Sequence, residues 1–373
     1  MKLMSKNNFI KNPVNYTRNV GNYIFGSGSI SNLDSILNKR KKEVDGEIII
    51  FIDKYFKNEN KFLKKNTLGK KDILFYVDTE KEPDTVIVNK FSNLILENQN
   101  LNPSTVVGIG GGSTMDISKA VSNLLTNPGK AEDYQGWDLL KNPSIYKIGI
   151  PTIFGTGSES TRTCVMTNSI TGLKLGMNSN YSIFDQIILD PDLTMSVPRN
   201  QYFWTGVDTY IHCIESLNGN YRNVISDSYS LQALKLCKDI FHSDDMMDHV
   251  NRSKMAVASY LGGCAIASSF LGLIHPLSAG LSVVLGLHHG VANCIVMRAM
   301  KEFYNEEYLE FWEMVNRQSV HIPSGVCNLL TEDQYESLYN STIIHEKPLT
   351  NALGSSFKEI LTKKKVKEIF KKM

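Results

Sequence analysis

The sequence lacks several features that would place it in a special class of protein. It has no apolar run of about 18 residues, so we expect no transmembrane helix. No long apolar stretch follows the first charged residues, so we expect no secretory signal peptide. The net charge of +2 gives no electrostatic reason to expect nucleic acid or a membrane surface as partner. The 373 residues, 42% hydrophobic and 21% charged, are typical of a globular protein with two domains or one large one.

Cysteine is sparse and shows no pairing pattern. The six cysteines are scattered, and none stands in a CxxC pair. Several lie in apolar segments, where a free thiol behaves as a small hydrophobe. This usage fits a reducing compartment better than a disulfide framework, and we therefore expect a cytoplasmic protein.

Short apolar runs alternate with helical patterns in the first half of the chain. We expect a helix that opens near Pro83. The expected strands are residues 47–53, 73–78, 105–112, 146–153 and 186–191. Strands that alternate with helices predict a parallel sheet with helices on both faces.

The pattern changes after about residue 193, where strand signals cease. Residues 226–241 and 253–285 are apolar at helical spacing. The second segment is apolar nearly all round, which predicts one central, buried helix. We therefore expect an α/β domain over residues 1–193 and an all-helical domain over residues 194–373.

Two glycine-rich turns follow expected strands. The first, GIGGGSTMDISKAVS, opens a helix, whose free N–H groups suit a pyrophosphate, although a tight turn without ligand explains it equally well. The second is PTIFGTGSEST. In addition, Asp53 ends the 47–53 strand, where its carboxylate could bind a ribose diol or simply cap a turn. An acid that binds the ribose favours NAD over NADP. The expected NAD-binding residues are Asp53, Gly110, Gly111, Gly112, Ser113, Asp116, Thr152, Thr156 and Ser158.

A metal site is indicated by an acid and several histidines in apolar segments. Asp208 and His212 are four residues apart, so they lie on the same face of a helix. Such a pair either binds a metal or is a core histidine with an acid as its hydrogen-bond partner. His275 and His289 would lie about 21 Å apart on one straight helix, too far for one ion, so that helix must break, for which Gly286 is suited. One carboxylate with imidazoles fits Fe²⁺ and Zn²⁺ alike.

The motifs GGGSTMDISKA, GTGSE, DTYIH and H…HHGVANC together resemble the iron-containing (group III) alcohol dehydrogenase family over roughly residues 20–300. The resemblance implies a Rossmann-like NAD(P)-binding domain followed by a helical metal-binding domain, as in dehydroquinate synthase, and a homodimer. It implies a metal bound by Asp208, His212, His275 and His289.

One position departs from the family pattern. Ala279 stands where many members carry a further histidine near the nicotinamide. His288 or a bound water is expected to take over the proton transfer. Because His289 directly precedes Gly290, as the metal ligand does in the family, His289 is favoured over His288 as the ligand.

Three segments, LTNPGKAEDYQGWDLLKNPS, GTGSESTRT and NSNYSIFDQIILD, are similar to family members that oxidise the terminal hydroxyl of an eight-carbon sugar acid for lipopolysaccharide synthesis. Arg162 is the expected partner of the substrate carboxylate, unless it forms an ordinary surface ion pair. The segment YQGWD could line the sugar site or be a packed loop; its candidate residues are Tyr134, Gln135, Trp137 and Asp138.

Three alternative functions remain open. A dehydrogenase of small alcohols or aldehydes would use the same site. A lyase of the dehydroquinate synthase type would need Lys and Arg residues for a phosphorylated substrate, and no such cluster lies near the metal motif. A binding protein that keeps the fold without catalysis is the third, because of Ala279.

Overall fold

The computed structural model describes residues 17–58, 62 and 68–373, which divide into two compact units. We call residues 18–153 and 158–195 the sheet unit. Residues 154–157 and 196–373 form the helical unit, so the short segment 154–157 belongs with the C-terminal part of the chain. The predicted domain boundary between residues 193 and 194 stays a prediction.

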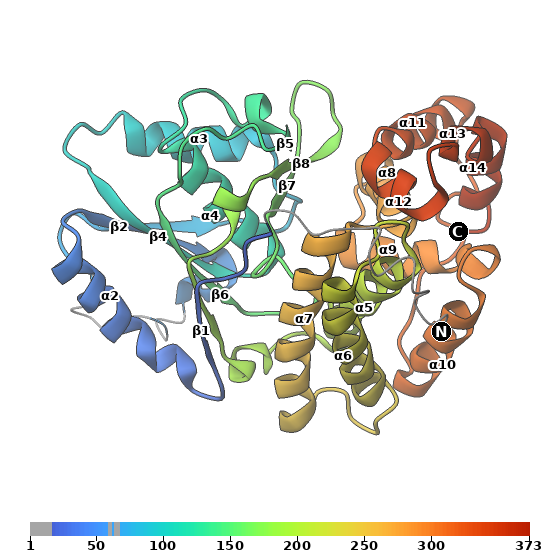
Figure 1. Cartoon of the computed structure of the whole chain (residues 1–373), viewed down its shortest axis with the longest axis horizontal. Coiled ribbons are helices and arrows are strands. Elements are labelled where there is room, and N and C mark those ends of the chain that lie inside the picture. The colour runs from blue at the N-terminus through green and yellow to red at the C-terminus, as the bar shows by residue number, and fades with distance from the viewer. Residues whose placement is uncertain (1–16, 59–61, 63–67) are drawn as a thin grey trace. The chain divides into compact units, whose positions relative to one another are not determined.

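A six-stranded parallel sheet forms the centre of the sheet unit (Figure 1). Its strand order is β1-β9-β6-β4-β2-β3, with β1 (Asn22–Phe25), β2 (Glu47–Asp53), β3 (Ile73–Val77), β4 (Pro103–Gly110), β6 (Tyr146–Pro151) and β9 (Gln186–Leu189). All five expected strands are present and parallel, which confirms the predicted fold class. Two features were not predicted: β1, with only four residues, and a small sheet of β5 (Gly136–Trp137), β8 (Lys174–Asn178) and β7 (Thr163–Thr167).

Helices cover both faces of this sheet because β2 is apolar on both sides. Ile49 and Phe51 pack in one core with residues of α3 (Thr85–Leu96) and α4 (Gly112–Leu124). Ile48, Ile50 and Ile52 point to the opposite core, which includes Leu33 and Leu37 of α2 (Leu33–Glu43). Figure 1 shows α2 and α3 on opposite sides of the sheet. Such a doubly covered strand reads as a continuous apolar run rather than an alternating one.

The first glycine-rich turn connects β4 to α4 through close packing. A Cβ atom at Gly110 would lie 2.6 Å from the hydroxyl of Thr114, and one at Gly108 would lie 2.3 Å from that of Ser118. Glycine at these two positions therefore lets α4 pack directly against the end of β4. The helix begins at Gly112, as the sequence predicts.

An ion pair in α4 links this helix to the last residues of the second glycine-rich turn and to β7. Lys119 is fully buried, and its Nζ donates hydrogen bonds to the carbonyl oxygens of Ser158 and Thr163. The carboxylate of Asp116 lies 3.3 Å from the same Nζ and accepts hydrogen bonds from the Ser158 hydroxyl and the Val165 N–H. The pair thus satisfies buried polar groups of Ser158, Thr163 and Val165.

The described residues of the helical unit contain helices and no strand, as predicted. The helices are α5 (Arg199–Asn218), α6 (Val224–Phe241), α7 (His249–Ser269), α8 (Ile274–Leu285), α9 (His289–Met297), α10 (Asn305–Gln318), α11 (Glu332–Ile343), α12 (Glu346–Leu353), α13 (Phe357–Ile360) and α14 (Lys363–Phe370). Their core contains many apolar residues of α5, which is buried over most of its length.

The single helix predicted over residues 253–285 is wrong, because the structure has two helices there, bent by 104° at the break. Phe270 ends α7 with a positive φ of 67°, and Pro276 lies in the first turn of α8, where its missing N–H costs no hydrogen bond. The buried amide of Asn351 donates to the carbonyl oxygens of Phe270 and Leu271. Within the described part of the chain, no single helix meets the length and apolarity of a membrane span, and only this bent pair does so jointly.

We predict that Lys119→Met destabilises the sheet unit by about 3–5 kcal/mol, because it leaves the Asp116 carboxylate without its cation. The measurement is urea unfolding followed by circular dichroism. Lys90→Met, which removes an exposed lysine of α3, is the control and should leave the midpoint unchanged. Equal midpoints for the two variants would contradict the prediction.

Candidate metal centre

Helix α5 carries three buried, ionisable side chains on one face. Asp208, His212 and Glu215 stand at positions i, i+4 and i+7, and each is at most 2% exposed. This spacing returns to the same side of a helix. The sequence prediction recognised the first two and missed Glu215.

The two other predicted ligands come from separate helices. His275 lies in the first turn of α8, and His289 is the first residue of α9. Helix α8 ends at Leu285, followed by Gly286 with a φ of +67°. The break expected between these histidines is therefore present at the residue predicted for it.

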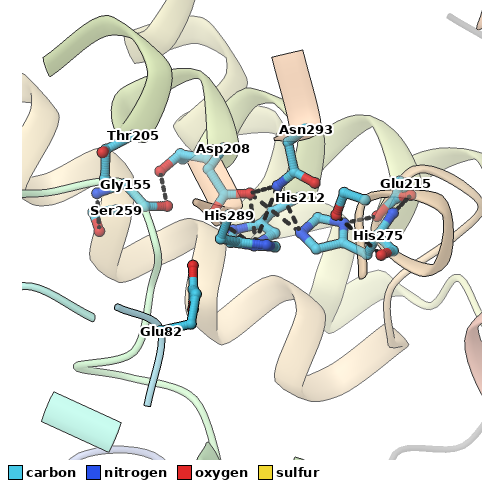
Figure 2. A network of polar contacts seen from close by, with 12 residues as sticks. Glu82, Gly155, Thr205, Asp208, His212, Glu215, Ser259, His275, His289 and Asn293 are labelled. Atoms are coloured by element: carbon cyan, nitrogen blue, oxygen red, sulfur yellow. Dashed lines mark hydrogen bonds and ion pairs between the residues drawn. The ribbon is translucent and has the colours of Figure 1, made fainter. Parts of the chain in front are cut away.

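The structure brings the four predicted ligands together (Figure 2). The Nε2 atoms of His212 and His275 lie 3.4 and 3.2 Å from Oδ1 of Asp208, and that of His289 lies 3.5 Å from Oδ2. One ligand atom each of Asp208, His275 and His289 fits within 4.8 Å of the others. The ring of His212 stacks on that of His275 with centroids 4.9 Å apart.

Two further polar side chains contact this cluster. Oε2 of Glu215 lies 2.6 Å from Nδ1 of His275. The amide nitrogen of Asn293 donates to Oδ1 of Asp208 at 2.7 Å and lies 3.2 Å from Nε2 of His289. Both residues carried a signal in the sequence, because each continues the polar face of its helix: Glu215 seven residues after Asp208, and Asn293 four after His289.

The charges of the cluster depend on one another. Burial alone would raise the pKa of Asp208, but the imidazoles of His212 and His289 hold it well below its usual value. Burial lowers the pKa of His212 to about 4, although Asp208 opposes the shift. Burial would also lower the pKa of His275, but Glu215 and Asp208 raise it to about 10. The cluster thus stabilises an ionised carboxylate and a positive charge beside it, a charge that a metal ion would supply in place of the proton on His275.

The donor atoms fit a divalent cation. Oδ2 of Asp208 is buried and accepts no hydrogen bond from the described residues, and Nδ1 of His212 likewise has no hydrogen-bond partner among them. Leaving a buried carboxylate oxygen unbonded is costly unless a cation neutralises it. A carboxylate with three imidazoles is a donor set that suits Fe²⁺ or Zn²⁺.

Two positions bear on the expected proton transfer. His288 precedes α9 as its N-terminal cap and is exposed. Ala279 lies one turn after His275 in α8 and is nearly buried. A methyl group cannot carry a proton, so Ala279 itself cannot take part in the proton transfer.

The predicted NAD-binding residues have the following contacts. Asp53 ends β2, and its carboxylate accepts hydrogen bonds from the Tyr55 N–H and the Thr79 hydroxyl. The N–H of Thr152 donates to the carbonyl oxygen of Gly110, which joins the two glycine-rich turns. Asp116 and Ser158 are hydrogen-bonded to each other, whereas Thr156 belongs to the helical unit. Gly111 caps α4, and Gly112 and Ser113 form its first turn. Their role in binding NAD stays a prediction.

The predicted sugar-site residues are engaged within the sheet unit. The guanidinium of Arg162 pairs with the carboxylate of Asp138, a residue with a φ of +56°. The amide of Gln135 bonds to Met166, Leu175 and Asn168, as in a packed loop, and the Tyr134 hydroxyl donates to the carbonyl oxygen of Pro128. Trp137 in β5 remains partly exposed. The contacts of Gln135 and Tyr134 fit the packed-loop alternative, and a role of this segment in a sugar site stays a prediction.

Comparison with solved structures defines the class of the fold. A 1,3-propanediol oxidoreductase aligns with a TM-score of 0.82 at 20% identity, covering 96% of this chain and 99% of that one. A sulfoacetaldehyde reductase from Bifidobacterium kashiwanohense, in complex with NAD⁺, aligns with a TM-score of 0.77 at 23% identity and covers 96% and 98%. At these identities the likeness concerns the fold alone.

Family models then identify the chain more closely. Residues 21–191 match the model for iron-containing alcohol dehydrogenase, and residues 203–337 match the model for the C-terminal part of the Fe-containing alcohol dehydrogenase family. The chain belongs to the iron-containing alcohol dehydrogenase family. This confirms the resemblance of the motifs and agrees with a divalent metal as cofactor.

Two curated relatives are similar over part of their length. The sulfoacetaldehyde reductase of Bilophila wadsworthia is 34% identical over 228 residues, which are 61% of this chain and 58% of that protein. The NAD-dependent methanol dehydrogenase of Bacillus methanolicus is 32% identical over 201 residues, 52% of each chain. The chain thus spans somewhat more than half the length of these relatives.

We predict that His289→Ala and Asp208→Ala each lower the affinity for the metal by more than about 100-fold. Loss of a residue that only hydrogen-bonds to a ligand lowers the affinity by up to about 100-fold, so loss of a ligand itself should cost more. Metal content after dialysis, measured by mass spectrometry, checks this. His288→Ala is the matched control, because this neighbouring histidine is exposed. Loss of metal from His288→Ala but not from His289→Ala would reverse the assignment.

Proposed function

We propose that this chain is a metal- and NAD-dependent oxidoreductase that interconverts a primary alcohol and its aldehyde. The observation that carries the proposal is the cluster of Asp208, His212, His275 and the partly buried His289, which would hold Fe²⁺ or Zn²⁺. The NAD-dependent methanol dehydrogenase among the relatives, together with the strand-to-helix glycine turn, supports NAD as the hydride acceptor.

When bound, the metal supplies Lewis-acid chemistry that lowers the pKa of the substrate hydroxyl. The residues of the chain then have three tasks. Asp208 and His212, which are buried, would hold the metal away from bulk water. The glycine turn before α4 would bind the pyrophosphate of NAD through backbone N–H groups. His288, exposed at the start of α9, takes the hydroxyl proton that Ala279 cannot accept, directly or through a water.

We infer a sugar acid as the substrate, and specifically 3-deoxy-D-manno-octulosonate, oxidised at C8 to the aldehyde that precedes amination to an 8-amino sugar of lipopolysaccharide. The three segments named above and Arg162 support this inference. Because Arg162 pairs with Asp138, the substrate carboxylate would have to replace Asp138 as its partner. A bidentate arginine gives such a site its selectivity for anions.

A second candidate substrate is sulfoacetaldehyde, favoured by the 34% identity to the sulfoacetaldehyde reductase of Bilophila wadsworthia. Its sulfonate is also an anion. We further propose a homodimer in the cytoplasm. All six cysteines are buried and none forms a disulfide, and burial raises the pKa of Cys164 to about 12, which keeps that thiol unreactive in a reducing compartment.

We predict that the metal-loaded protein forms NADH most efficiently with 3-deoxy-D-manno-octulosonate, with a kcat/KM at least about tenfold above that for butanol or glycerol, a ratio equal to roughly 1.4 kcal/mol. Initial rates of NADH formation check this, with NADH consumption by sulfoacetaldehyde as a parallel assay. A higher kcat/KM for butanol than for the octulosonate would indicate a general alcohol dehydrogenase instead. Product formation without net NADH would indicate a lyase, and no turnover of any compound a binding protein.

We predict that Arg162→Ala raises KM for the octulosonate by about 10–100-fold, as expected for loss of a hydrogen bond to a charged group. The KM for butanol should stay unchanged. Asp138→Asn should lower the KM for the octulosonate, because it frees Arg162 from its ion pair. Asparagine tolerates the positive φ at this position, so the backbone should stay unchanged. Equal effects of Arg162→Ala on both substrates would exclude a carboxylate site at this residue.

A further inference from the structure

We propose that Glu215 is a positioning residue of the metal centre, which fixes the ring of His275 and the start of α8 with a single carboxylate. The proposal rests on the metal site proposed above. It goes beyond the four ligands, because Glu215 would not touch the metal, the cofactor or the substrate.

The two oxygens of Glu215 have different partners. Oε2 lies 2.6 Å from Nδ1 of His275. Oε1 accepts hydrogen bonds from the backbone N–H groups of Ile274, at 2.5 Å, and His275, at 3.4 Å. These N–H groups belong to the first turn of α8, where no preceding turn can satisfy them. A carboxylate at this end of a helix is also favoured by the helix dipole.

The contact with Nδ1 determines what the other ring nitrogen of His275 can do. An ionised carboxylate only accepts hydrogen bonds, so Nδ1 must carry the proton. In the neutral ring, Nε2 is then left with a lone pair, and it is Nε2 that lies 3.2 Å from Asp208 within the cluster. A partner of this kind orients a histidine ligand and increases its basicity.

The surroundings of Glu215 leave no space for another group to replace its carboxylate. The side chain of Glu215 has no exposed area, so bulk water cannot replace it. At Gly272, in the break between α7 and α8, a Cβ atom would lie 2.9 Å from the hydroxyl of Tyr304 and 3.0 Å from Cγ of Glu215. The chain therefore passes close around Glu215 before it enters α8, and the side chain that orients His275 also determines where this helix begins.

The experiment compares Glu215→Gln with Asn351→Ala. Glutamine keeps the volume and an acceptor for α8 but removes the charge facing Nδ1. Asn351→Ala loosens the same break from its other side, since Asn351 bonds to Phe270 and Leu271 without contacting His275. Affinity of the metal-free proteins for Zn²⁺ is measured by competition with a chelator, and stability by thermal unfolding of the same metal-free samples.

We expect Glu215→Gln to lower the affinity for Zn²⁺ by about 10–100-fold and Asn351→Ala to lower stability but change the affinity by less than about threefold. An unchanged affinity in Glu215→Gln, or an equal loss in both variants, overturns the positioning role. A parent protein that binds no Zn²⁺ overturns the metal site as well, so the two failures are distinct.

A second measurement does not depend on the folding of a variant. In the Zn²⁺-loaded parent protein with ¹⁵N-labelled histidine, His275 should show a protonated, slowly exchanging Nδ1 and a metal-shifted Nε2. The signal is assigned by its loss in His275→Gln. An unprotonated Nδ1 at this residue overturns the proposal.

Discussion

The buried carboxylate of Asp208 is the group on which the rest of the helical unit depends. Removing a carboxylate from water costs several kcal/mol unless charges and hydrogen bonds compensate. Within α5 only His212 contacts this carboxylate, so most of the compensation comes from other helices. His212, His275, His289 and Asn293 supply it from α5, α8 and α9, and their arrangement explains why α8 and α9 both begin close to one carboxylate.

The break between α7 and α8 follows from this requirement. A continuous helix over the same residues would bury an apolar surface more simply, but it would not place the first turn of α8 over Glu215. The structure instead accepts a positive φ at Phe270, a conformation that costs a side-chain-bearing residue of order 1–3 kcal/mol. Buried hydrogen bonds, donated by the Asn351 amide and accepted by the Glu215 carboxylate, hold the chain in that conformation. Backbone strain is thus located next to the residues proposed to bind the metal.

Much of this could be predicted from the sequence, for identifiable physical reasons. The strands of the main sheet are continuous apolar runs, because both faces of β2 and its neighbours are covered. The pair Asp208 and His212 obeys a local rule of helix spacing, and Gly286 marks a helix end. The 104° bend was missed because apolar periodicity does not detect hydrogen bonds from distant residues such as Asn351. Pro276 and Gly272 were the available local signals. Glu215 was overlooked since its partner, His275, is distant in sequence.

The two acids predicted for the cofactor site illustrate how local contacts limit a sequence-based assignment. A carboxylate offers about four lone-pair sites. Asp116 uses its oxygens for Ser158, Val165 and the ammonium of Lys119, so its contacts primarily hold α4 against the second turn. Asp53 has two partners, Tyr55 and Thr79, and remains only partly buried. Acceptor capacity therefore remains at Asp53 for a ribose diol, whereas at Asp116 the structural contacts use most of it. Of the two predictions, the structure is the more favourable to Asp53.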